Sequence, residues 1–321
     1  MFPSLAPYES GLLAVGDSQQ IYWECSGNPN GRPVVYLHGG PGSGCSPRNR
    51  CFFDPATDRI VLTDQRGCGR SRPLVESAAD LESNTTAHLI TDLERLREHL
   101  EIDRWAVVGV SWGSTLALAY AQTHPHRVTA IALASVTTTS RREVQWITHG
   151  VGRIFAQQWE RFAAVAHGDH ENERQLAGIY HALLFDADDA VREHAAREWC
   201  AWEDAHVSLA PGSAANPRFD DPAFRLRFAR LVTHYWKHAA FLADDQLIRE
   251  VSLLESTPGI LIHGRYDVSS PLETAWRLHK SWRRSELHVV DDAGHGGGSM
   301  SEALVTAIAR LRTASGSVVP D

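Results

Sequence analysis

The sequence contains no long hydrophobic run and no block of basic residues. No stretch approaches the roughly 18 consecutive apolar residues that a membrane-spanning helix needs, so a transmembrane helix is excluded. Lysine and arginine number 31 against 39 aspartates and glutamates, which gives a formal net charge of −8. Without a basic patch, nucleic acid and anionic membrane surfaces are poor candidate partners.

Cysteine is also scarce. The five cysteines are Cys25, Cys45, Cys51, Cys68 and Cys200, and none forms a CxxC pair. The odd number and the spacing argue against a disulfide framework and against a zinc site. The first residues, MFPSLAPYESG, lack the basic and apolar regions of a signal peptide. We therefore expect a soluble protein of the reducing cytoplasm.

The sequence is rich in side chains that can build a core. It is 43% hydrophobic and contains ten Trp, ten Phe and seven Tyr in 321 residues. Such a composition is not that of a disordered chain. The length corresponds to about two domains, or to one large α/β domain with an insertion.

Short apolar runs alternate with segments of helical periodicity, a pattern typical of an α/β fold with a mostly parallel, doubly wound sheet. One helix is predicted to begin after Asn84 as its N-cap and to continue through leucines at helical spacing, and another is predicted around 301–311. Strands are predicted at 21–25, 34–37, 60–63, 105–109, 128–133, 260–263 and 287–290.

The middle of the chain has a different character. It carries many Trp, His and Arg residues and shows no convincing strand. An all-helical insertion between two halves of one sheet explains this better than two consecutive domains. We expect an α/β core formed by residues 1–136 and 255–321, with a helical cap formed by residues 137–254.

The candidate nucleophile is Ser111 in Gly109-Val110-Ser111-Trp112-Gly113. This G-x-S-x-G pattern lies between a predicted strand and a helix of small residues. On such a sharp turn the serine Oγ stands above the sheet, and the flanking glycines let neighbouring backbone approach. The pentapeptide alone is a weak signal, because glycine and serine are common in loops, and its context strengthens it.

A glycine-rich loop, His38-Gly39-Gly40-Pro41-Gly42, follows the predicted strand at 34–37. In this position it can supply an oxyanion hole, with the backbone N–H of Gly40 pairing with that of Trp112. We interpret His38 as a structural loop residue. A second loop, DQRGCGRS at 64–71, follows the strand at 60–63, and we expect its arginines to brace it through hydrogen bonds.

Asp267 and His295 follow the two late strands, in the chain order Ser, Asp, His that an α/β hydrolase requires. His295 would take the Ser111 proton and return it to the leaving group, and Asp267 would hold the imidazole tautomer. Asp291 and Asp292 are rival acids, but they follow the strand that delivers the histidine. We interpret those two as part of a solvated turn.

The motifs HGGPG, DQRGCGRS and GVSWGSTLAL, together with GRYD at 264–267, resemble the prolyl aminopeptidase (proline iminopeptidase) family. The resemblance covers nearly the whole chain, including the predicted cap. It implies an α/β-hydrolase fold with a helical cap and the release of an N-terminal proline from a peptide. It also implies that the reaction uses no metal and no organic cofactor.

The resemblance further implies a residue that binds the substrate's free amine. Trp199-Cys200-Ala201-Trp202-Glu203 matches a cap motif in which the carboxylate, here Glu203, has this role. A carboxylate facing an ammonium forms a charge-assisted hydrogen bond and rejects N-acylated substrates. From the residues alone, the favoured interpretation is a helix that packs two tryptophans and has a surface glutamate at its edge.

Three positions depart from the family pattern. Val232 stands where the resemblance implies a second amine-binding glutamate, and Thr148-His149-Gly150 replaces a Gln-Glu-Gly. Gly296, Gly297 and Gly298 replace small polar residues after the histidine. These changes do not affect the predicted hydrolytic residues, but they bear on proline specificity.

We conclude from the sequence that the chain is a serine hydrolase that releases an N-terminal residue, with proline the leading candidate, from short peptides. One alternative is an esterase or amidase of the same fold that has lost free-amine selectivity, with a small amide or ester as its substrate. Another is a non-catalytic binding protein on a hydrolase scaffold, which the complete set of site residues disfavours.

Overall fold

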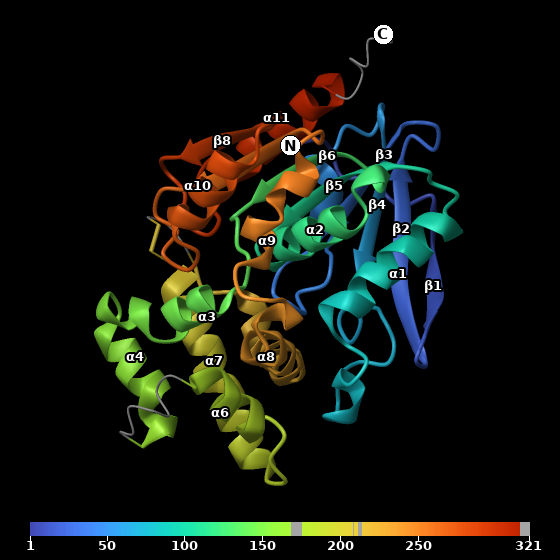
Figure 1. Ribbon diagram of the computed structural model, residues 1–321. Helices are drawn as coiled ribbons and strands as arrows, with labels where there is room; N and C mark the ends of the chain where they lie inside the picture. Colours follow the sequence, from blue (N-terminus) through green and yellow to red (C-terminus); the bar gives the residue numbers. More distant parts are fainter. Residues whose placement is uncertain (168–174, 208, 211–213, 315–321) are drawn as a thin grey trace.

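The computed structural model describes residues 1–167, 175–207, 209–210 and 214–314, and its centre is one eight-stranded sheet (Figure 1). The strand order is β1-β2-β4-β3-β5-β6-β7-β8. β1 and β2 pair antiparallel with their neighbours, and the remaining strands are parallel. The predicted α/β fold is confirmed. The strands are β1 (Glu9–Gly16), β2 (Gln19–Gly27), β3 (Arg32–Leu37), β4 (Asp58–Asp64), β5 (Trp105–Val110), β6 (Val128–Ala134), β7 (Gly259–Gly264) and β8 (Ser285–Val290).

The central strands are nearly continuous apolar runs because helices cover both of their faces. β5 and β6 are buried along almost their whole length. β1 differs, because it is an edge strand with mostly exposed or half-buried side chains, and Leu12 is 47% exposed. Its apolar run is short, only residues 12–15 between two glycines, and the sequence analysis did not assign it to a strand.

Helices pack on the two faces of the sheet. On one face lie α1 (Thr86–His99), α2 (Trp112–Thr123) and α10 (Leu272–Ser281), which contribute Leu96, Leu116 and Leu278 to a large hydrophobic core. On the other face α11 (Met300–Ala314) packs Leu304 and Ile308 against β6 and β7. The short helix α9 (Gln246–Arg249) precedes β7. No helix in the described ranges combines the length and apolarity needed to cross a membrane.

The start of α1 differs by one residue from the prediction. Thr85, not Asn84, is the N-cap, and its side chain accepts from the backbone N–H of His88. Asn84 is buried instead, where its amide donates to the Arg66 carbonyl and accepts from the Tyr235 hydroxyl. Asn84 thus joins the loop after β4 to a helix far along the chain, a role that local capping rules do not show.

Between β6 and β7 the described residues form helices and loops and no strand. The longer helices pack around their own aromatic core, in which Phe162 stacks on Tyr180 and Trp202. Figure 1 shows them together at one end of the sheet. They are α3 (Arg141–Thr148), α4 (Ala156–Ala163), α6 (Leu176–Leu183), α7 (Asp189–Val207) and α8 (Pro222–Lys237).

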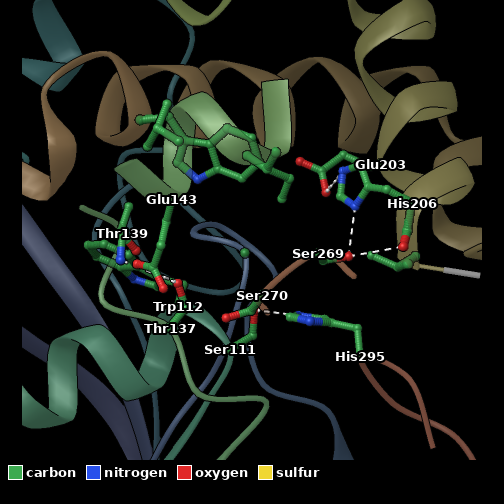
Figure 2. A pocket seen from close by; sticks show the side chains of 15 residues that line it. Ser111, Trp112, Thr137, Thr139, Glu143, Glu203, His206, Ser269, Ser270 and His295 are labelled. Carbon is green, nitrogen blue, oxygen red and sulfur yellow. Dashed lines mark hydrogen bonds and ion pairs between the residues drawn. The ribbon is translucent and has the colours of Figure 1, made fainter. Parts of the chain in front are cut away.

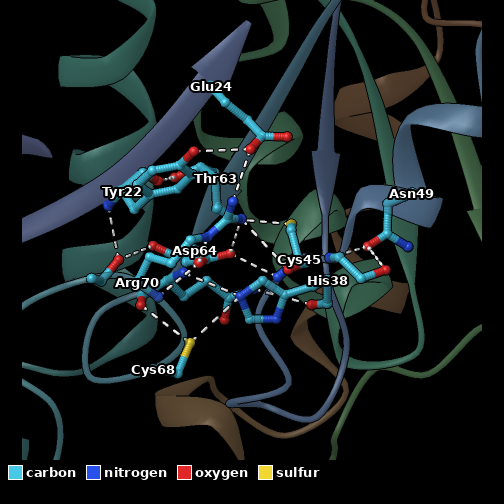
Figure 3. A network of polar contacts seen from close by, with 12 residues as sticks. Tyr22, Glu24, His38, Cys45, Asn49, Thr63, Asp64, Cys68 and Arg70 are labelled. Atoms are coloured by element: carbon cyan, nitrogen blue, oxygen red, sulfur yellow. Dashed lines mark hydrogen bonds and ion pairs between the residues drawn. The ribbon is translucent and has the colours of Figure 1, made fainter. Parts of the chain in front are cut away.

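A buried ionic network fixes the loop after β4 (Figure 3). Arg70 donates through Nε to Asp64 (2.8 Å) and through its guanidinium to Glu24 (2.8 Å). Asp64 also accepts from the backbone N–H of Cys45 at 2.7 Å. On the same loop, Arg66 pairs with the buried Asp92. The two arginines brace this loop as the sequence predicts.

The close packing of α2 against β3 generates a stability prediction. A Cβ on Gly113 would overlap the backbone carbonyl of Leu37, whereas one on Gly178 of α6 would meet nothing within 4 Å. We expect Gly113→Ala to lower the free energy of unfolding by about 1–3 kcal/mol or more. Gly178→Ala is the matched control and should raise it by up to about 1 kcal/mol. Equal effects in denaturant titrations would contradict this packing.

Candidate active site

Ser111 lies at the turn between β5 and α2, with φ 56° and ψ −125°. This left-handed conformation is uncommon for a residue other than glycine and costs about 1–3 kcal/mol. The surrounding backbone enforces it. A Cβ on Gly109 would overlap the carbonyl oxygen of Gly113, so the turn closes only because Gly109 lacks a side chain. The result is a serine raised above the carboxyl ends of the strands, at the N-terminus of α2.

The three residues predicted to carry proton transfer lie in one hydrogen-bonded line. His295 Nε2 is 2.8 Å from Ser111 Oγ, and His295 Nδ1 is 3.0 Å from Asp267 Oδ2. Asp267 is fully buried as a side chain and also accepts from the backbone N–H of Ser270. The imidazole therefore donates from Nδ1 and presents Nε2 to the serine hydroxyl.

Electrostatics favour this arrangement. Burial alone would lower the pKa of His295, but the Asp267 carboxylate and its hydrogen bond raise that pKa above its usual value. Burial alone would raise the pKa of Asp267. The nearby imidazoles outweigh the effect of burial, so the pKa of this carboxyl is lowered. Asp267 is thus held as a carboxylate that stabilises an imidazolium at His295.

The rival acids face elsewhere. Asp291 is exposed and pairs with Arg265, and Asp292 accepts from the backbone and hydroxyl of Ser299 at the start of α11. Both belong to the turn after β8, as the sequence suggests.

The loop after β3 and the turn at Ser111 are joined by one side chain. Gln65 donates from Nε2 to the carbonyl of His38 (3.1 Å) and accepts at Oε1 from the indole N–H of Trp112 (2.8 Å). Its backbone N–H also donates to His38 Nε2. His38 donates from Nδ1 to the carbonyl of Gly39 and is buried, which fits a structural role. Gln65 therefore fixes Gly40 relative to Trp112, the two residues predicted to form the oxyanion hole.

A pocket opens above Ser111 (Figure 2). The core supplies Gly40, Ser111, Trp112 and His295, and helices α3, α7 and α8 supply the opposite wall. That wall is largely apolar, with Val144, Ile147, Val207 and Trp236, and it contains the polar groups Glu143, Glu203 and His206.

The two carboxylates of the pocket differ in what they bind. Glu143 is already paired, because it accepts from the backbone and hydroxyl of Thr138 and from the hydroxyl of Thr274. Glu203 is not, because its Oε1 is buried and has no hydrogen-bond partner in the described part of the chain. Burial raises the pKa of Glu203 to about 8, although the charge of His295 and the nearby indole N–H of Trp199 oppose the rise.

The positions that depart from the family pattern lie away from this pocket. Val232 is fully buried in the aromatic core of the helical segment. His149 packs edge-on against Trp159. Gly296 and Gly297 have open space around them. None of these residues lines the pocket above Ser111.

Sequence reasoning missed three pocket or support residues. Gln65 is part of a recognisable motif, but no pattern shows that its amide spans two loops. His206 follows Glu203 by three residues on α7, so the spacing alone places both on one helix face. Ser269, which bonds to His206 Nδ1 (2.8 Å), lies on a loop with no distinguishing sequence signal.

Chemically, the geometry suits acyl transfer to a serine. A nucleophile, a base oriented by a buried carboxylate and backbone N–H groups at a helix N-terminus surround one cavity. The partial positive charge of the N-terminus of α2 faces the place where a carbonyl oxygen would gain negative charge.

Comparison with known proteins agrees with this chemistry. Residues 32–297 match the α/β hydrolase fold family. The chain is 50% identical over 313 residues to a probable proline iminopeptidase of Streptomyces coelicolor, covering 96% of each. It is 43% identical over 297 residues to a proline iminopeptidase of Xylella fastidiosa, covering 92% of this chain and 93% of the relative.

Similarity to solved structures concerns the fold alone. VinJ superposes with a TM-score of 0.65 at 20% identity, over 96% of this chain and 99% of the other. A putative lipase of Acinetobacter baumannii superposes with a TM-score of 0.64 at 13% identity, over 96% and 92%.

The bridging role of Gln65 can be tested by turnover. Gln65→Met removes both side-chain hydrogen bonds and leaves two buried groups unpaired, so we expect kcat to fall about 10-fold or more with KM little changed. Gln122→Met is the control, since it loses a buried hydrogen bond to the Leu247 carbonyl at the far end of α2. Equal kcat values for the two variants would refute the bridge.

Proposed function

The chain belongs to the proline iminopeptidase family of α/β hydrolases, and we propose that it releases N-terminal proline from short peptides through an acyl-enzyme on Ser111. The observation that carries the proposal is one pocket holding two features. Ser111 Oγ lies 2.8 Å from His295 Nε2, and Glu203 presents an unpaired carboxylate oxygen to the same cavity.

In the first half of the reaction, His295 takes the proton of the Ser111 hydroxyl as Oγ attacks the carbonyl carbon of the N-terminal residue. The backbone N–H groups of Gly40 and Trp112 stabilise the oxyanion. Asp267 stabilises the imidazolium. His295 then donates its proton to the leaving amine, and the peptide without its first residue departs.

In the second half, water replaces the amine. His295 removes a proton from the water, the hydroxide attacks the acyl carbon, and Ser111 recovers its proton as the free amino acid leaves. These steps use only groups of the chain that surround the pocket.

Glu203 supplies the preference for a free N-terminus. An ionised carboxylate buried beside the scissile bond is satisfied by an ammonium and left unpaired by an acylated amine. Glu143 cannot take this role, because hydrogen bonds already occupy both of its oxygens. The apolar side of the pocket, with Ile147 and Trp236, suits the ring of proline.

The proposal extends to the setting in which the enzyme works. All five cysteines are free, which is typical of a reducing compartment, and this supports the cytoplasm. The net charge of −8 gives no support to a nucleic-acid partner.

One observation favours the alternative of an esterase or amidase without amine selection. Val232 is buried in the helical core, so α8 offers no carboxylate to the pocket at this position. A prolyl arylamide and its N-acetyl derivative separate the two functions, because only the aminopeptidase discriminates between them.

Ser111→Ala tests the nucleophile. Because the three residues of the line act as a unit, we expect kcat to fall by a factor of about 10³ or more with thermal stability retained. Ser256→Ala, an exposed serine, is the control and should keep full activity. Retention of a tenth of the normal rate by Ser111→Ala would overturn the assignment.

The raised pKa of Glu203 generates a pH prediction. Below pH 8 the empty pocket holds a protonated Glu203 carboxyl, and binding an ammonium to the carboxylate must release that proton. KM for a prolyl arylamide should therefore rise about 10-fold per unit as the pH falls below 7.

The Glu203→Gln variant should have a higher KM at pH 8 and should lose this slope. KM for the N-acetyl derivative should not depend on pH in this way. A prolyl KM that stays constant between pH 6 and 8 would show that Glu203 does not bind the amine as a carboxylate.

A further inference from the structure

Two buried acceptors without partners share one wall of the pocket. Glu203 Oε1 and His206 Nε2 are both shielded from water, and neither has a hydrogen-bond partner in the ranges that the structure describes. Glu203 Oε2 lies 3.6 Å from His206 Nε2, and His206 is only 1% exposed. Leaving a buried polar atom unpaired costs stability, so this pair points to a ligand that donates hydrogen bonds.

The hydrogen bonds of His206 assign its tautomer. Ser269 Oγ donates its single proton to the backbone carbonyl of His206 (3.1 Å) and therefore accepts from Nδ1–H (2.8 Å). Nε2 is then the bare nitrogen, and it lies on the side of Glu203 (Figure 2). Burial, with a smaller contribution from His295 and opposed by Asp267, lowers the pKa of His206 to about 3. His206 is thus a neutral acceptor at ordinary pH.

The charge and number of these acceptors define the complementary group. An ionised Glu203 carries one negative charge, and Glu203 Oε1 and His206 Nε2 are two buried acceptor atoms that lack a donor in the described ranges. A secondary ammonium carries one positive charge and two N–H donors. No other pocket-lining side chain in the described ranges has an unpaired buried acceptor.

We propose that His206 Nε2 is the second acceptor for the N-terminal ammonium, and that Glu203 and His206 together hold the two N–H groups of the secondary ammonium of proline. This assignment rests on the proposed aminopeptidase function. It makes Ser269 a positioning residue, since its hydroxyl holds the imidazole in the accepting tautomer.

The test compares three 4-nitroanilides that share a five-membered ring: prolyl, N-methylprolyl and cyclopentanecarbonyl. The protonated ring nitrogen of the prolyl substrate carries two N–H donors, and that of the N-methylprolyl substrate carries one. The cyclopentanecarbonyl ring has no nitrogen. The measured quantity is the ratio of kcat/KM for the prolyl to the N-methylprolyl substrate. The proteins are the wild type, His206→Phe, His206→Leu, His206→Gln and the control His181→Phe, whose histidine lies outside the pocket.

We expect the wild type and His181→Phe to prefer the prolyl substrate by at least about 10-fold, the value of one charge-assisted hydrogen bond. His206→Phe and His206→Leu should reduce this preference to about 3-fold or less. His206→Gln should restore part of it, because its amide oxygen also accepts. Phenylalanine keeps the bulk of the imidazole, so a preference that arose from the extra methyl group alone would persist in that variant.

An unchanged ratio in a folded His206→Phe or His206→Leu variant, or a wild-type ratio near one, would overturn the role of His206. The cyclopentanecarbonyl substrate separates this from a failure of the proposed function. If the wild type does not prefer the prolyl to the cyclopentanecarbonyl anilide, the amine site itself is wrong. If it does and the His206 variants match the wild type, only the role of His206 falls.

Discussion

The close contact between α2 and the strands beneath it is the constraint on which the site depends. Gly113 packs on the carbonyl of Leu37, and Gly109 packs on the carbonyl of Gly113, so neither position has room for a side chain. This contact forces Ser111 into its left-handed conformation and raises Oγ above the sheet. Because parallel strands end at the same edge, the loops after β3, β7 and β8 then meet the serine there. The positions of Gly40, Asp267 and His295 all follow from that edge.

The core and the inserted helices contribute different chemistry to one cavity. The core provides a nucleophile, Ser111, and a base, His295. The positive charge that His295 gains is balanced by the buried carboxylate of Asp267. The helical wall is mostly apolar and leaves the carboxylate of Glu203 unpaired. Burial keeps that carboxyl largely protonated at neutral pH in the empty pocket. In the proposed function, a cationic substrate restores the charge that the fold suppresses, and this difference is the basis of the proposed selection for a free amine.

Much of this organisation can be predicted from sequence because it is local. The G-x-S-x-G turn, the glycine-rich loop and the order of Ser111, Asp267 and His295 each depend on residues beside a strand end. The remainder depends on contacts between distant segments. Asn84 looks like a helix cap but binds Tyr235, and Gln65 reaches both His38 and Trp112. The edge strand β1, whose apolar run is short and whose side chains are largely exposed or half-buried, was not predicted either. The unpaired state of Glu203 and His206 is a property of the folded pocket, which no spacing rule contains.

Trapping the acyl-enzyme tests the central claim most directly. A prolyl ester is mixed in excess with the protein, and the reaction is quenched in acid within milliseconds. We expect this activated substrate to acylate Ser111 faster than the acyl-enzyme is hydrolysed, so that the covalent species accumulates. Mass spectrometry of the digested protein should then find one prolyl group, on the peptide that contains Ser111. The Ser111→Ala protein and the N-acetylprolyl ester should give no such adduct. A prolyl adduct on another residue, or equal labelling by the acetylated ester, would contradict a serine aminopeptidase built on this pocket.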